Sequence, residues 1–149
     1  MSEVGVFGRA MVMAVLGCAL GCVLGCVLGC GGSVVAEVSD PIAGEAVLRV
    51  DVDVASTAAE RMRGLRGRDA LPRDRGLWIE FPVEDELCIV NEGVPFAIDA
   101  IWIAGEVVQE VRTFAANDGV PHCARGSDVL EVNAGAASEV RPGFRARRR

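Results

Sequence analysis

Residues 76–114 read GLWIEFPVEDELCIVNEGVPFAIDAIWIAGEVVQEVRTF, and this stretch decides the fold class. It predicts four short apolar strands, at 76–81, 87–91, 96–103 and 107–114, separated by proline, glycine, asparagine and acidic residues. The helices of about 10–15 residues that separate the strands of a parallel α/β sheet are not found here. The spacing therefore favours a mainly-β domain, an antiparallel β-sandwich or barrel.

The strand pattern continues on both sides of this stretch. Residues 46–54 alternate polar and apolar side chains, which is typical of a half-buried strand. Residues 128–133 predict a further strand, and 141–145 a last short one. Residues 115–127 have no period and are expected to form a loop.

One short helix is expected near the N-terminus of this domain. Thr57 precedes Glu60 by three positions, which is the spacing of a capping box. The helix should run to about Arg63, because Gly64 favours a helix end.

Composition restricts the class of protein. The chain has 149 residues, 15 basic and 21 acidic side chains and a formal charge of −6. An acidic chain with 51% hydrophobic residues is neither a general nucleic-acid binder nor a disordered protein. About 119 residues follow residue 30, which fits a single domain.

The first 30 residues predict export. Residues 10–29 carry no charge, and their last part resembles a bacterial lipoprotein signal peptide in which Gly29 precedes Cys30. An uncleaved membrane anchor with glycines on one helix face, a plain secretory signal and a metal-binding cysteine stripe are the alternatives. The expected lipidation site is Cys30, with Cys26, Cys22 and Cys18 as alternatives.

These patterns divide the chain into four parts. Residues 1–30 are a signal peptide or membrane anchor, and 31–45 are a flexible linker of mixed glycine, serine, proline and acids. The mainly-β domain covers 46–145, and 146–149 form a basic tail. The tail either contacts anionic lipid head groups or ends in solvent. We expect a monomer, anchored at the periplasmic or extracellular face of the cell envelope.

The order of motifs from Ala58 onward resembles the domain of unknown function 192 family. That resemblance implies a mainly-β, sandwich-like fold, often exported, with no established activity. The motifs are Glu60-Arg61, Gly64-Leu65-Arg66, Arg68-Asp69-Ala70-Leu71-Pro72, Gly76-Leu77-Trp78-Ile79, Val129-Leu130-Glu131 with Gly135, and Pro142-Gly143.

The chain departs from the most distinctive family stretch, Trp-Met-Lys-Asn-Thr followed by Pro-Leu-Asp. The corresponding residues begin at Cys88, and the family lysine becomes Val90 while Asn91 is retained. The aspartate becomes Ala97, and Asp99 would point to the same side of a strand and substitute for it. Asn91 and Asp99 are therefore candidate ligand-binding residues of a degenerate or re-purposed domain.

Arginines gather in residues 61–75. Their planar guanidinium groups suit carboxylates and phosphates, so we expect an anion-binding rim that includes Arg61 and Arg68. The alternative is a solvated surface on which neighbouring acids pair with these arginines. The implied partner is a small anionic ligand or a component of the envelope.

Two cysteines and one histidine remain to be placed. Cys88 and Cys123 either form a disulfide, stay unpaired, or join His122 in a thiol–imidazole or metal site. A single histidine excludes a two-histidine metal site. We assign no catalytic residues, no metal and no cofactor.

The sequence favours a non-catalytic binding or accessory domain of the cell envelope. One alternative is an enzyme that acts on envelope material through His122 and Cys123, or through Asn91 and Asp99. A second alternative is a structural interaction domain. No nucleic-acid partner is expected.

Overall fold

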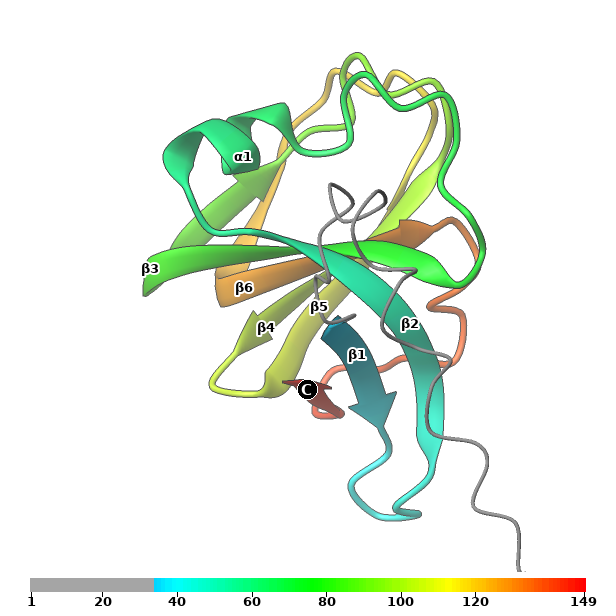
Figure 1. The fold of residues 1–149 in the computed structure, drawn as a ribbon. Coiled ribbons are helices and arrows are strands. Elements are labelled where there is room, and N and C mark those ends of the chain that lie inside the picture. Colours follow the sequence, from blue (N-terminus) through cyan, green and yellow to red (C-terminus); the bar gives the residue numbers. More distant parts are fainter. Residues whose placement is uncertain (1–33) are drawn as a thin grey trace, which may run out of the picture. The chain divides into compact units, whose positions relative to one another are not determined.

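The computed structural model describes residues 34–149, which belong to one compact unit, Ser33–Arg149. The leader of residues 1–30, with Cys30 and the other candidate lipidation sites, lies outside the described residues. In the described part, no helix is long and apolar enough to cross a membrane. The elements are β1 (Val34–Ser39), β2 (Ala46–Ala55), α1 (Ala58–Arg63), β3 (Arg75–Ile89), β4 (Ile98–Ala104), β5 (Val107–Phe114), β6 (His122–Asn133) and β7 (Arg145–Arg148) (Figure 1).

The strands close into a barrel in the order β1-β2-β3-β6-β4-β5-β7, and β7 pairs with β1 to complete it. The mainly-β prediction is confirmed, but a purely antiparallel arrangement is wrong because β2 and β3 are parallel. The segment of α1 and the loop after it returns the chain to the start of the sheet, which a parallel pair requires. The helix is not near the N-terminus of the chain, since β1 and β2 precede it.

The expected linker of residues 31–45 contains a barrel strand. Ala36 and Val38 of β1 are fully buried, and β1 pairs with β2 on one side and β7 on the other. The linker prediction is therefore wrong for Val34–Ser39, and the domain begins before residue 46. The pattern was weak because four of these six residues are valine or alanine, so polar and apolar positions hardly alternate.

The expected basic tail is also part of the barrel. Ala146 is buried, and the surrounding residues form β7 rather than a solvated end. Arg147 and Arg148 of this strand, and Arg149 after it, form ion pairs along the barrel wall. The pairs are Arg147–Glu106 at 3.2 Å, Arg148–Glu80 at 3.2 Å and Arg149–Glu37 at 3.7 Å.

Strand β3 is longer than expected. The predicted strands at 76–81 and 87–91 are joined in one strand, whose pairing with β6 is irregular between Glu80 and Asp85. Pro82 lies in this irregular part. Because the hydrogen-bond ladder is interrupted there, the missing N–H group of proline removes no regular hydrogen bond between the strands. Strand β6 begins at His122, so the loop expected over residues 115–127 ends earlier than predicted.

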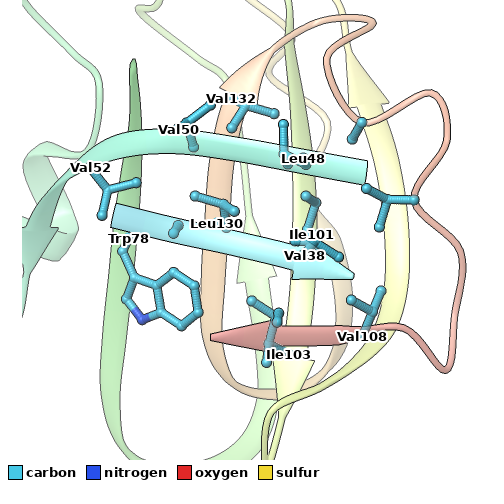
Figure 2. Packing of buried hydrophobic residues seen from close by; sticks show 14 residues of the cluster. Val38, Leu48, Val50, Val52, Trp78, Ile101, Ile103, Val108, Leu130 and Val132 are labelled. Atoms are coloured by element: carbon cyan, nitrogen blue, oxygen red, sulfur yellow. The ribbon is translucent and has the colours of Figure 1, made fainter. Parts of the chain in front are cut away.

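Two apolar cores lie on opposite faces of the same strands. The first fills the barrel and includes Val38, Val50, Ile101 and Leu130 (Figure 2). Because side chains alternate along a strand, the neighbours of the inward residues face outward. These outward residues form the second core, which the loop after α1 covers with Leu65 and Leu71. Glu131 follows Leu130 and faces this second core.

Candidate functional site

A pocket of about 350 Å³ opens in the second core, between α1, the loop after it, the middle and end of β3 and the C-terminal part of β6. We call it the α1 pocket. Most of the residues that line it are apolar, and four polar side chains stand among them. Those polar residues are Arg61, Arg66, Asn91 and Glu131.

A capping box begins the helix that borders the α1 pocket. The Thr57 hydroxyl accepts the N–H of Glu60 at 3.2 Å, and the Glu60 carboxylate accepts the N–H of Thr57 at 2.9 Å and of Ser56 at 3.1 Å. These hydrogen bonds, chiefly that from the Thr57 N–H, lower the pKa of Glu60. The predicted helix is confirmed, and it ends at Arg63 before Gly64.

Glu131 is the buried carboxyl of the α1 pocket, with only 5% of its surface exposed. In residues 34–149 its side chain has no hydrogen-bond partner. Burial raises the pKa of Glu131 to about 7, although the positive charges of Arg66 and Arg68 act in the opposite direction. Near neutral pH this carboxyl therefore exists in both protonation states.

Asn91 presents a second unpartnered polar atom. Its Nδ2 donates to the carbonyl oxygens of Phe96 at 2.9 Å and Ala115 at 2.8 Å, which fixes the orientation of the carboxamide. Its Oδ1 is buried and has no hydrogen-bond partner in the described chain. Since Asn91 lines the α1 pocket, this oxygen is an acceptor available to a bound molecule.

The two arginines of the pocket differ in their engagement. Arg61 donates through Nη1 to the backbone oxygens of Ser56 and of Glu80, the latter at 3.1 Å, and it lies 5.3 Å from the centre of the Phe81 ring. Arg66 donates to the Met62 carbonyl at 3.0 Å and forms no ion pair among the residues that the structure describes. Arg61 is therefore fixed in the wall, whereas the charge of Arg66 is not neutralised by a carboxylate.

Arg68, the other arginine expected to bind ligand, lies outside the pocket lining. Its Nη2 is 2.8 Å from the Asp53 carboxylate, which also pairs with Arg75 at 2.7 Å. The expected rim is thus divided: Arg61 and Arg66 line the α1 pocket, and Arg68 is engaged by an acid. Its effect on the pocket is through its charge, which lowers the pKa of Glu131.

Asp99 does not share a site with Asn91. Its Oδ2 accepts the N–H groups of Gly135 at 2.8 Å and Ala137 at 3.0 Å, and its Oδ1 accepts the Thr113 hydroxyl at 2.6 Å. Ala137 belongs to the core inside the barrel. Asp99 therefore fastens the turn after β6 to the barrel, and it does not line the α1 pocket.

Cys88 and Cys123 form a disulfide between facing positions of β3 and β6. Of the alternatives that the sequence left open, the structure shows this one, and a thiol–imidazole pair with His122 is not present. His122 contacts the Glu110 carboxylate and the edge of the Trp102 ring instead. The Glu86 carboxylate lies near both sulfurs, but sulfurs joined to each other are not free thiolate ligands for a metal.

Sequence reasoning missed Glu131 as a site residue, and it placed Arg66 only within the arginine-rich stretch of the expected rim. The signal for Glu131 was present: an acid stands between Leu130 and Val132 in a predicted strand, and it belongs to one of the quoted family motifs. Both faces of the C-terminal part of β6 are covered, since residues 129–132 are all buried, so an acid in this part becomes buried. No local pattern showed that Arg66 would meet it.

The family model DUF192, described as an uncharacterised ACR, matches residues 40–147. A comparison with curated proteins finds no match. Two solved structures share the fold. A "putative transcription regulator" from Sinorhizobium meliloti 1021 is similar with TM-score 0.72 and 19% identity, over 78% of this chain and 93% of that chain. A protein of unknown function from Novosphingobium aromaticivorans DSM 12444 is similar with TM-score 0.69 and 22% identity, over 76% of this chain and 83% of that chain.

Proposed function

This chain belongs to the uncharacterised DUF192 family, and from that premise we propose that it is a lipid-anchored binding domain of the bacterial cell envelope, which holds a small ligand in the α1 pocket. One observation carries the proposal. The Asn91 Oδ1 is a buried atom without a hydrogen-bond partner in the described chain, and the largely buried Glu131 carboxyl, whose pKa burial raises, lines the same pocket.

The energetic argument rests on the cost of such groups. A buried polar group without a hydrogen bond costs roughly 1–3 kcal/mol, so most buried polar groups in folded proteins are paired. One such atom, the Asn91 Oδ1, beside the buried Glu131 carboxyl is explained if a bound molecule supplies donors to both. Apolar walls interrupted by a few convergent polar groups are typical of small-molecule sites.

The leader and the disulfide support a place outside the cytoplasm. Gly29-Cys30 follows an uncharged stretch as in lipoprotein signals, and lipidation of Cys30 would attach the domain to a membrane. The Cys88–Cys123 disulfide suits an oxidising compartment.

An enzyme acting on envelope material is the second candidate, and one observation favours it. A carboxyl whose pKa is about 7 is suited to general acid–base chemistry, and Glu131 is such a group. Binding alone remains the proposal, since Asp99 holds backbone groups and Cys123 is in a disulfide. Turnover of a bound compound, lost in Glu131→Gln, would support the enzyme instead.

A ligand screen tests the binding proposal. The full chain, purified in mild detergent, is screened by thermal shift against a broad small-molecule library beside the variant Ala58→Trp. Ala58 is an exposed residue of α1 that lines the pocket, so tryptophan there should obstruct the opening without entering either core. A compound that raises the melting temperature of the wild type and not of this variant supports the proposal. Hits that act equally on both, or no hits, count against it.

Acyl labelling tests the anchor. Cells expressing the full chain are labelled with a fatty-acid analogue, and the wild type is compared with Cys30→Ala and with a variant in which Cys18, Cys22, Cys26 and Cys30 are all alanine. Label in the wild type and none in the fourfold variant supports lipidation. An unlabelled wild-type chain would contradict it.

A further inference from the structure

We propose that the α1 pocket binds a free α-amino acid with an apolar side chain, whose ammonium group lies between Glu131 and Asn91 and whose carboxylate lies at Arg66. This inference rests on the proposed binding function and names the ligand class.

The ammonium group is indicated by two acceptors without donors. The Asn91 Oδ1 is buried and accepts no hydrogen bond in the described chain, and no hydrogen bond contributes to the pKa of the buried Glu131; both residues line the pocket. An ammonium group offers three donors, which is enough for both acceptors at once. It also supplies the positive charge that a buried carboxylate needs, which a neutral N–H group would not.

The carboxylate is indicated by the one pocket arginine whose charge has no acidic partner in residues 34–149. Arg66 donates to the Met62 carbonyl and forms no ion pair there, whereas Arg61 is held by two backbone oxygens. A guanidinium group can bind a carboxylate through two parallel hydrogen bonds. Glu131 and Arg66 thus present opposite charges to one pocket, which matches a zwitterion.

The apolar side chain is indicated by the walls and the size of the pocket. Leu65, Ile79, Ile89 and Val94 line it and are buried. Its volume of about 350 Å³ lies at the small end of the range for ligand sites, which runs from roughly 300 to 1,000 Å³. A molecule of amino-acid size fits this space better than a long lipid or an oligosaccharide.

A purely anionic ligand requires a neutral Glu131, whereas an ammonium group favours the ionised form. The anionic ligand would bind beside this carboxyl only in its protonated form, so its affinity would fall as the pH rises. The charges that act on Glu131 are those of Arg66 and Arg68, the latter paired with Asp53. Strands β3 and β4 place Leu77 and Ala100 in register with Glu131, and neither carries charge. A zwitterion should therefore bind more tightly above neutral pH.

Calorimetric titration of the full chain in detergent at pH 8 tests the proposal, with L-leucine, L-isoleucine, L-methionine and L-phenylalanine as probes. At least one should bind, and N-acetyl-leucine and leucinamide should bind at least about tenfold more weakly than leucine, because each lacks one of the two charges. Glu131→Gln should also bind leucine at least about tenfold more weakly than the wild type does. Arg66→Met should weaken the binding of leucine and leave the binding of leucinamide unchanged.

The matched control is Arg63→Met, which removes an exposed arginine of α1 that does not line the pocket. It should bind leucine as the wild type does. If Glu131→Gln fails to fold, the comparison of leucine with N-acetyl-leucine on the wild type still decides the role of the ammonium group.

Three results would overturn the inference: none of the four amino acids binds, N-acetyl-leucine binds as tightly as leucine, or leucinamide does so. A library compound whose binding is blocked by Ala58→Trp would, in each case, leave the broader binding proposal standing. The two failures are therefore distinguishable.

Discussion

Glu131 and Asn91 line one pocket, although Glu131 lies near the end of β6 and Asn91 follows β3. The pocket thus holds the buried Glu131 carboxyl and the Asn91 Oδ1, a buried oxygen without a hydrogen-bond partner in the described chain. When Glu131 is ionised, its carboxylate and the Asn91 Oδ1 are both acceptors, so neither can donate a hydrogen bond to the other. In the β3–β6 ladder Glu131 is paired with Leu77, whereas Ile89, two residues before Asn91, is paired with His122, so the two residues are far apart along the ladder and meet only at the pocket. In the proposed function, a ligand supplies the missing donors.

Glu131 makes the stability of the domain depend on pH. Its pKa is about 7 in the folded protein and 4.5 ordinarily, so between these values the folded state holds a proton that the unfolded state lacks. The contribution of Glu131 to stability should be full below pH 4.5 and fall by up to about 3 kcal/mol as the pH rises to 7. Urea unfolding at several pH values measures this fall. Glu131→Gln should reduce it, and the exposed Glu139→Gln should not.

Asp99 should matter for stability and not for ligand binding. Asp99→Ala leaves the part-buried N–H group of Gly135 and the buried N–H group of Ala137 without an acceptor, which should cost about 2–5 kcal/mol. Asp99→Asn keeps an oxygen there and should cost less. Chemical unfolding checks the order, with the exposed Asp69→Ala as control. A stable Asp99→Ala variant would contradict the structural role.

The Cys88–Cys123 disulfide closes a long loop, since the cysteines are 35 positions apart. Replacing both by serine should cost about 2–4 kcal/mol, because the unfolded chain regains freedom. Differential scanning calorimetry should show a lower melting temperature for this double variant, and a phosphine reductant should lower that of the wild type only. A wild type insensitive to reductant would speak against a formed disulfide.

Gly76 has a packing role in the sheet. A Cβ at this position would lie 2.9 Å from the Glu131 carbonyl oxygen and 3.2 Å from Val52 Cγ1, so Gly76→Ala forces backbone to move. We expect a loss of about 1–3 kcal/mol. Gly119→Ala is the control, because a Cβ there meets nothing within 4 Å and its φ is not positive. Equal unfolding midpoints for the two variants would contradict this argument.

Val90 tests the charge balance of the pocket, since it lines the α1 pocket at the position where the family motif has lysine. Val90→Lys brings an ammonium group into the pocket, which should lower the pKa of Glu131 and flatten the pH dependence of stability. Leucine binding should weaken at least about tenfold, because the lysine competes for the same carboxylate. Val83→Lys, at a valine with 64% exposure outside the pocket, should change neither.

Much of the barrel could be predicted from local pattern. Strand β5 has the expected bounds, β2 differs by one residue, and the Thr57–Glu60 capping box starts the helix where expected. These elements were readable because each depends on neighbours within a few residues: alternation for a strand, a three-residue spacing for the cap.

The first and last strands were not readable in this way. Ala36 and Ala146 are small residues whose burial follows from the meeting of β1 with β7, two segments at opposite ends of the described chain. The parallel pairing of β2 with β3 likewise depends on where the chain returns after α1, which no local spacing states.

The sequence by itself determined the mainly-β class, the family, the helix cap and the retention of Asn91. Only the tertiary structure decided which polar residues meet: Asp99 binds backbone groups beside the barrel core, Arg68 binds Asp53, and Glu131 reaches the pocket with Asn91 and Arg66. The physical reason is that alternation assigns a side chain to a face of its strand, while the charge and hydrogen-bond partners on that face come from distant segments that the closed barrel brings together.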